Sequence, residues 1–155
     1  MVDILRGTEI APARGKLGVL MPGIGAVSST LLTGVFSVRK GLARPVGSLA
    51  QSGRMRLGKR TEIRFLPIRE VIDLAGLEDL AFGGWDCFPD TAYEAARKAK
   101  VLTSEHLAAV RDELEAVAPM PAVFDRKFVR NLDGRHVKKG RTKMDLAEAL
   151  MKDIS

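Results

Sequence analysis

The sequence predicts an α/β protein whose parallel sheet is flanked by helices, and two observations support this. Residues 17–21 form a short apolar run that Pro22 and Gly23 break, and apolar residues at helical spacing begin at Val27. This order of strand, glycine turn and helix opens a βαβ unit of the Rossmann type. Later apolar runs, at residues 80–82 and 122–124, alternate with helical stretches. We therefore expect a Rossmann-like parallel sheet.

The turn after the first strand is a candidate phosphate-binding site. Backbone N–H groups at a helix N-terminus can take up the charge of a pyrophosphate, and glycine lets the backbone approach it closely. A serine stands where the third glycine of this motif is usual, and a tight turn that binds nothing is the alternative interpretation. The candidate residues are Gly23, Ile24, Gly25, Ala26, Val27 and Ser28.

Composition limits the possible classes. The chain has 155 residues, 46% hydrophobic and 28% charged, which is typical of one globular domain. Residues 1–14 form a polar lead-in that we expect to be flexible, without the apolar core of a signal peptide. The longest apolar runs fall short of the ~20 residues that would cross a bilayer, so no membrane partner is expected. A single cysteine, Cys87, fits the reducing cytoplasm.

The net charge of +6 favours an anionic partner but does not choose among nucleotide, sugar phosphate and nucleic acid. Neither His106 nor His136 has partners at metal-ligand spacing, and His106 is interpreted as a surface residue. The residues alone therefore predict no metal site and identify no catalytic acid, base or nucleophile.

The first helix follows the glycine turn. We expect Ser28 or Ser29 as its N-cap, a close packing contact at Gly34, and an end at Lys40 with Gly41 beyond it. Its buried side is predicted to contain Leu31, Leu32, Val35, Phe36 and Val38.

Residues 45–51 are the predicted second strand, and here the generic dinucleotide motif fails. An acid is expected about 20 residues beyond the glycines to bond the ribose, but residues 42–52 contain none, and Gln51 is the nearest polar substitute. The basic loop that follows could receive the extra phosphate of NADP, or it could simply be solvated. A nucleic-acid platform is poorly supported, because Phe65 is the one aromatic residue near these charges. The basic residues are Arg54, Arg56, Lys59, Arg60 and Arg64.

The third strand is predicted at residues 80–82, ending at Gly83-Gly84, after a short helix or connection at 68–74. Ligands of open α/β sheets bind beyond the carboxyl ends of the strands, which is where Trp85 and Asp86 fall. We interpret Trp85 as core filler. Asp86 is a candidate ligand contact, and a cap of the following turn is its equal alternative.

The remainder is predicted to be mostly helical. Asp90 is expected to cap a helix over 91–100, and Thr103 or Ser104 a second helix to about 117. A strand is expected at 122–124, and a turn at 133–134 lies within the basic stretch 126–143, which is either a solvated loop or an anion site. Thr142 begins a last helix over 144–154.

Several blocks together resemble myo-inositol-1-phosphate synthase, also called inositol-3-phosphate synthase. They are KLGVLMPGIGAVSSTLLTGV at 16–35, RLGKRTE at 56–62, FGGWD at 82–86, PMPAVFD at 119–125 and KKGRTKM at 138–144. The family converts glucose 6-phosphate to inositol phosphate with a tightly held NAD that oxidises the sugar, allows an aldol-type cyclisation and then reduces the product. The resemblance implies NAD as cofactor, a cytoplasmic protein and a homo-oligomer in the complete enzyme, with no nucleic-acid partner.

The resemblance also implies site residues. Residues 23–27 match the family's pyrophosphate loop, and Asp86 matches an acid that contacts the nucleotide. Ala122 and Val123 match positions that line the cofactor, although Ala122 stands where other members have serine. The loop is more compact than the Asn-Asn-Gly form of eukaryotic members, so contacts of those asparagines do not transfer.

Family members are much longer than this chain. The resemblance therefore implies that residues 15–155 are the N-terminal part of an incomplete Rossmann-like domain, with catalytic residues outside it and no synthase activity of its own. Two alternatives remain open at this point: another NAD(P)-dependent oxidoreductase, and a basic nucleic-acid-binding module that uses residues 126–143.

Overall fold

The computed structural model describes residues 15–59, 61, 64–125, 127 and 129–154; the predicted lead-in at 1–14 lies outside them. Residues 15–155 were predicted to be part of one domain. In the structure they divide into two compact units. The smaller unit contains Pro45–Leu80 and the described residues before Gly18, and the larger contains Gly18–Arg44 and Ala81–Ser155.

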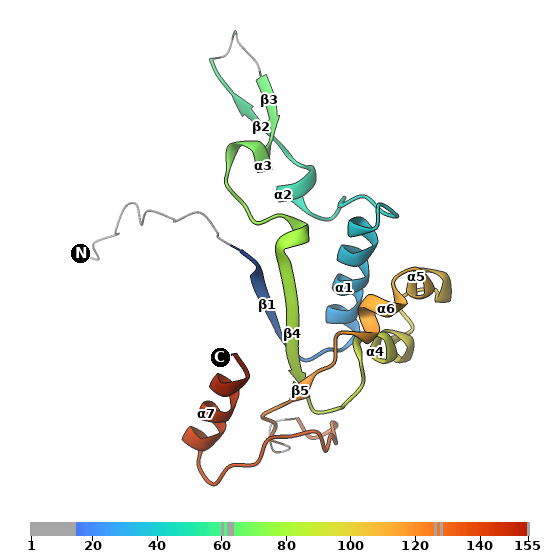
Figure 1. Ribbon diagram of the computed structural model, residues 1–155, viewed down its shortest axis with the longest axis vertical. Helices are drawn as coiled ribbons and strands as arrows, with labels where there is room; N and C mark the ends of the chain where they lie inside the picture. Colours follow the sequence, from blue (N-terminus) through green and yellow to red (C-terminus); the bar gives the residue numbers. More distant parts are fainter. Residues whose placement is uncertain (1–14, 60, 62–63, 126, 128, 155) are drawn as a thin grey trace, which may run out of the picture. The chain divides into compact units, whose positions relative to one another are not determined.

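The larger unit is built on a three-stranded sheet in the order β1-β4-β5. Strands β1 (Leu17–Pro22) and β4 (Leu80–Asp86) run in the same direction (Figure 1), and β4 pairs in parallel with β5 (Met120–Pro121). The strands follow one another across the sheet in chain order with helices between them. This is the arrangement of a βαβαβ half of a Rossmann fold, so the predicted fold class is confirmed.

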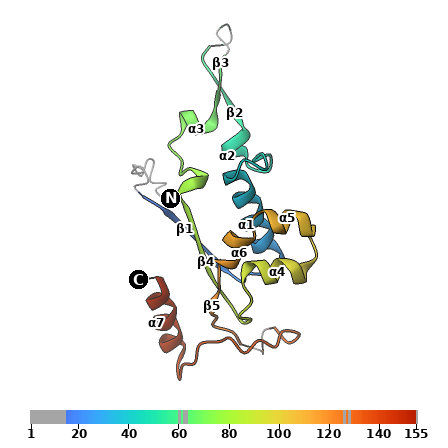
Figure 2. The same cartoon turned by 45° about the vertical axis from the view of Figure 1, so that its right-hand side comes forward.

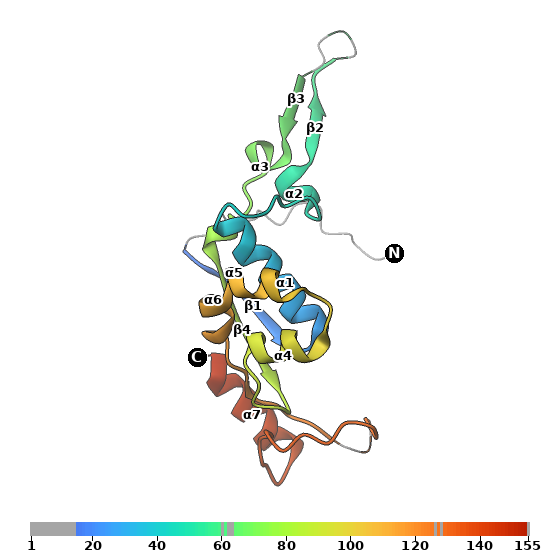
Figure 3. The ribbon, with the colours of Figure 1, turned by 90° about the vertical axis from the view of Figure 1, so that its right-hand side faces the viewer.

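One face of this sheet is covered by α1, α4, α5 and α6, and α7 lies on the opposite side (Figures 1 and 3). The helices are α1 (Ala26–Arg39), α4 (Ala92–Ala99), α5 (Ser104–Ala109), α6 (Arg111–Glu115) and α7 (Lys143–Ile154). The apolar core between sheet and helices contains Met21, Ile24, Leu32, Phe36, Ala92, Ala96, Leu107, Val110 and Leu114.

Helix α1 begins earlier than predicted. Its N-cap is Gly25, and neither predicted serine caps it: Ser28 and Ser29 lie inside the first turn, and Ser29 is buried. The expected close contact at Gly34 is also wrong, because a Cβ there would meet nothing within 4 Å. The predicted end is confirmed, since Lys40 is the C-cap and Gly41 has a φ of +71°. Of the predicted buried side, Leu31 is exposed and Val38 partly buried.

The smaller unit replaces the predicted second strand. Residues 49–52 form a short helix, α2 (Leu49–Ser52), and the basic loop forms an antiparallel hairpin of β2 (Arg54–Leu57) and β3 (Arg64–Pro67), shown in Figure 2. The predictions of a strand at 45–51 and of a loop after it were therefore wrong. Of the short helix or connection predicted at 68–74, residues 68–71 form the helix α3 (Ile68–Val71). A 3-10 turn at Leu77–Asp79 precedes β4. Arg60 lies outside the described residues.

Strand β4 is longer than predicted, because it continues through Gly83-Gly84 to Asp86. It can do so because Gly84 faces β1, where a Cβ would lie 2.2 Å from the Met21 carbonyl oxygen. The last predicted strand also shifts: residues 120–121 form β5, and Ala122 continues as an isolated parallel bridge to Val137.

Threonine residues cap the N-termini of the helices α4 and α5, which follow β4. Thr91, not Asp90, caps α4, in a capping box with Glu94. Thr103 caps α5 as predicted, but the helix expected to reach 117 breaks at Val110 into α5 and α6. The expected turn at 133–134 lies instead at 130–131. Thr142 accepts a hydrogen bond from the Asp145 N–H at 3.1 Å, which confirms the start of α7.

Candidate functional site

The glycine turn is held by hydrogen bonds at the carboxyl ends of β1 and β4. Gly23 has a φ of +102°, which favours glycine, and its N–H donates to the Trp85 carbonyl oxygen at 2.7 Å. The Ser28 hydroxyl donates to the Gly23 carbonyl oxygen, also at 2.7 Å. The serine in the third glycine position therefore fixes the turn.

Asp86 connects this turn to the end of β4. Its Oδ2 accepts a hydrogen bond from the Ile24 N–H at 2.7 Å, and its Oδ1 accepts one from the Phe88 N–H at 2.9 Å. The predicted turn-capping role is therefore present. Asp86 also ends the strand next to β1, and a dinucleotide fold carries its ribose-binding acid at the end of that strand. Asp86 thus occupies the position of that acid in the strand order, and along the chain the Pro45–Leu80 segment lies between it and the glycine turn.

The N–H groups that remain available lie at the start of α1. Those of Gly25, Ala26 and Val27 have no earlier helical carbonyl to bond, as in any first turn. A Cβ built on Gly25 would meet nothing within 4 Å, so the backbone is open to a ligand there. Ile24 differs from its neighbours, because Asp86 uses its N–H and its side chain is buried in the core.

An apolar cavity of about 300 Å³ lies beside the turn, at the carboxyl ends of β4 and β5. The structure brings four of the predicted site residues together here: Gly23, Asp86, Ala122 and Val123. The other lining residues are Pro22, Trp85, Cys87, Phe124, Leu132 and Leu150. Burial and the neighbouring Asp86 carboxylate raise the pKa of the Cys87 thiol, which therefore stays neutral as a buried side chain.

The outer wall of this cavity is anchored by Asp153 of α7. Its carboxylate accepts hydrogen bonds from the Trp85 Nε1–H at 2.6 Å and from Lys138 Nζ, and the Lys138 ion pair measures 2.7 Å. The hydrogen bond from Lys138, and then that from Trp85, lower the pKa of Asp153. Lys138, one cation of the basic stretch, therefore has a structural role. Trp85 lines the cavity and is not the core filler that was predicted.

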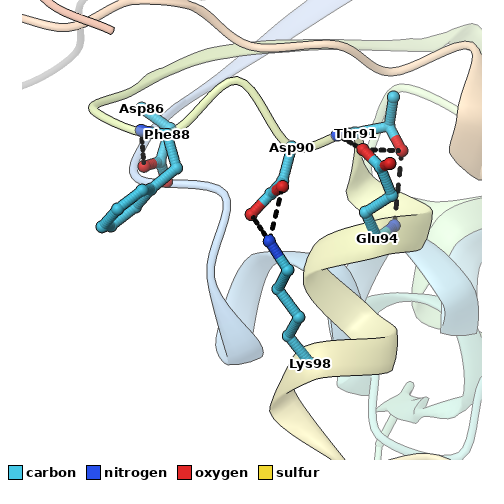
Figure 4. Close-up of polar contacts among 6 residues, drawn as sticks. All are labelled: Asp86, Phe88, Asp90, Thr91, Glu94 and Lys98. Carbon is cyan, nitrogen blue, oxygen red and sulfur yellow. Dashed lines mark hydrogen bonds and ion pairs between the residues drawn. The ribbon is translucent and has the colours of Figure 1, made fainter. Parts of the chain in front are cut away.

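A second cavity of about 320 Å³ also has Asp86 in its lining and lies next to the start of α1. Its charged lining residues are Asp86, Asp90 and Lys98, and Figure 4 shows Lys98 reaching back from α4 to both carboxylate oxygens of Asp90. Sequence reasoning missed Asp90 and Lys98 as site residues, because helix spacing does not predict a contact between positions so far apart.

Three observations concern histidine, metal ligands and membrane helices. His106 is exposed on α5, as predicted. Within the described part of the chain, His, Cys, Asp and Glu side chains form no group of three that could hold a metal ion. The helices of the described ranges include none that is both long and apolar enough to cross a membrane.

Comparison with known proteins agrees with this geometry. The family model of the NAD-binding domain described as myo-inositol-1-phosphate synthase matches residues 17–155. The chain belongs to the myo-inositol-1-phosphate synthase family. Among curated members, inositol-3-phosphate synthase 1 of Bacteroides thetaiotaomicron is 48% identical over 147 residues, covering 94% of this chain and 34% of that protein.

Two further relatives are less similar in sequence. A probable inositol 3-phosphate synthase isozyme 3 of Arabidopsis thaliana is 33% identical over 154 residues, with 90% of this chain and 30% of that protein covered. The crystal structure of inositol-3-phosphate synthase from Caenorhabditis elegans shares the fold, with a TM-score of 0.80 at 22% identity over 93% of this chain and 31% of that one. The chain thus spans about a third of the length of the synthases it matches.

Proposed function

We propose that this chain forms the part of an inositol-3-phosphate synthase that binds the adenosine diphosphate portion of NAD. The observation that supports this most directly is the turn at Gly23–Gly25, held by the Asp86 carboxylate at the edge where β1 and β4 both end. A glycine turn, a helix N-terminus and a strand-end acid at one edge are what a dinucleotide fold requires.

Each predicted residue has a role in this proposal. The N–H groups of Gly25, Ala26 and Val27 bind the diphosphate, and Ile24 and Ser28 hold the turn. Asp86 accepts a hydrogen bond from a ribose hydroxyl with the lone pairs that its two backbone contacts leave free. Ala122 and Val123 line the apolar cavity for the adenine, and the alanine offers only apolar contact there.

In the complete enzyme the substrate is glucose 6-phosphate and the product 1D-myo-inositol 3-phosphate, formed by oxidation, intramolecular aldol cyclisation and reduction. Bound NAD supplies the hydride acceptor and then the donor of the two redox steps. We assign no catalytic residue within this chain, which by itself is expected not to turn over the sugar phosphate. We further propose a homo-oligomer of the complete enzyme, a cytoplasmic location consistent with the free Cys87, and no nucleic-acid partner.

The test is a titration of the chain with NAD, followed by the emission of Trp85, its one tryptophan, which lines the apolar cavity. Gly25→Ala is the decisive variant, because Gly25 has extended backbone at φ −93° and free space around it, so an added methyl group changes the ligand-free chain little. We expect its affinity for NAD to fall at least about tenfold, since the methyl group stands where the diphosphate approaches.

Gly34→Ala is the matched control. It adds the same methyl group to the same helix, also in free space, but away from the turn. We expect unchanged affinity and slightly higher stability. Equal NAD binding by Gly25→Ala and the unchanged chain, or no NAD binding by the unchanged chain, would contradict the proposed site.

A further inference from the structure

The second cavity contains an arrangement of charge that the binding of NAD does not require. Asp86, Asp90 and Lys98 line it together, so its charged groups leave one net negative charge. We propose that the Asp90–Lys98 ion pair is a specificity determinant that makes this site reject NADP. This inference rests on the proposed function.

The cavity lies where the extra phosphate of NADP would enter. That phosphate is esterified to the ribose hydroxyl that a strand-end acid otherwise bonds, and a nearby cation accommodates it in NADP-binding members of the fold. In this chain the strand-end acid is Asp86, and the connection from β4 to α4 continues into the wall of the cavity through Phe88 and Asp90.

Lys98 is the cation that could receive such a phosphate, and Asp90 occupies it. Lys98 Nζ lies 2.6 Å from Asp90 Oδ1 and 2.5 Å from Oδ2, while its side chain is 68% exposed against 25% for Asp90. The acid is thus the more buried partner, and the lysine reaches it from α4 (Figure 4). A phosphate in this cavity would be repelled by the carboxylates of Asp86 and Asp90. Lys98, the cation that could bind it, would already be paired with Asp90.

The backbone keeps Asp90 in this place. Asp90 directly precedes the capping box in which Thr91 and Glu94 satisfy the first turn of α4. Asp90 therefore does not serve as the helix cap, and its carboxylate is available to Lys98.

The experiment compares two small ligands that differ only in the phosphate at issue: adenosine 5′-monophosphate and adenosine 2′,5′-bisphosphate. Both are titrated into the chain with Trp85 emission as the signal, and NAD and NADP follow as the complete cofactors. In Asp90→Asn, which removes one carboxylate and releases Lys98, we expect affinity for the bisphosphate to rise about tenfold. Affinity for the monophosphate should change less than about twofold.

Two further variants separate the released cation from a general change of charge. Asp90→Asn combined with Lys98→Met should return bisphosphate affinity to the original value or below it. Glu115→Gln removes an acid from another exposed ion pair, Arg111–Glu115 on α6, and should leave both affinities unchanged. The midpoint of urea unfolding shows that each variant is folded.

The outcomes distinguish this inference from the proposed function. If the unchanged chain binds neither NAD nor the monophosphate, the proposed function itself fails. If it binds both but the bisphosphate-to-monophosphate affinity ratio of Asp90→Asn equals that of the unchanged chain, the specificity role is wrong. A gain that persists in the double variant would also overturn the assignment of Lys98.

Discussion

Gly83 and Gly84 are neighbours in β4 with opposite surroundings. A Cβ on Gly84 would lie 2.2 Å from the Met21 carbonyl oxygen, whereas a Cβ on Gly83 would meet only the end of the Leu20 side chain at 3.6 Å. One glycine is therefore required by the approach of β1 to β4, and the other is not.

This contrast gives a prediction at the scale of single residues. Gly84→Ala should destabilise the fold by about 3 kcal/mol, because the backbone of β1 must move away, and Gly83→Ala should change stability by less than about 0.5 kcal/mol. Urea unfolding monitored by Trp85 emission measures both. Equal unfolding midpoints for the two variants would show that the strands do not pack as described.

Asp86 shows how one side chain can have both of the roles that the sequence left as alternatives. Its two oxygens each accept a backbone N–H, one from the turn after β4 and one from Ile24 in the glycine turn. A carboxylate has about four lone-pair sites, so a ribose hydroxyl can still be accepted. Turn capping and ligand contact are therefore compatible at this position.

At the scale of elements, α7 has an anchor in Asp153 and an apolar contact in Leu150, which lines the cavity. It contains no buried residue, and Asp153 near its C-terminus connects it to Trp85 and Lys138. An acid in the last turn opposes the helix dipole, so these two donors stabilise a charge that the helix itself disfavours.

The anchor predicts how α7 responds to acid. The pKa of Asp153 is lowered below its ordinary value of 3.8. Its contribution to stability is therefore complete above about pH 4 and is lost as the pH falls through the lower, folded-state pKa. We expect Trp85 emission to shift in that acid range, and Asp153→Asn to show the shifted emission already at neutral pH. If the variant and the unchanged chain share one emission spectrum and one acid profile, α7 is held by other contacts.

An element could be predicted from the sequence where the residues that determine it are close together in the chain. The first strand and the end of α1 depend on neighbouring residues and were predicted. The glycine turn was predicted from its contiguous motif, although its hydrogen bonds to Trp85 and Asp86 are long-range. The second strand was wrong because an apolar run of this length fits either a strand or a helix, and here residues 49–52 are helical. The hairpin did have a signal, since Arg54-Met-Arg-Leu57 alternates polar and apolar residues with a period of two.

The candidate site was predictable in part for the same reason. The glycine turn is contiguous, Asp86 was found from its place at a strand end, and Ala122 and Val123 were found through the resemblance. The bond between Asp86 and Ile24 joins residues 62 positions apart, and the anchor of Trp85 on Asp153 joins residues 68 apart. Contacts at such separations are fixed by the tertiary fold, which a single sequence does not display.

At the scale of the whole molecule, the two units differ in how much they bury. The described residues of Pro45–Leu80 include no buried side chain, and several large apolar ones are exposed, among them Val46 at 82% and Leu49 at 74%. A two-stranded hairpin with little apolar burial is marginally stable in water.

We therefore expect the smaller unit to open more readily than the larger one. Amide hydrogen exchange in Pro45–Leu80 should be about a hundredfold faster than in α1 and in the Gly84–Asp86 part of β4. Exchange resolved by peptide mass spectrometry measures this in the intact chain. Matching protection in the two units would mean that they unfold together.

The hydrogen bond between Ile24 and Asp86 has a consequence for the order in which the molecule folds. It closes a loop of 62 residues, and long closures cost chain entropy before any contact repays it. The glycine turn therefore cannot reach its final shape from residues 17–30 alone. We therefore expect the proposed phosphate site to form late in folding, once β4 has docked beside β1.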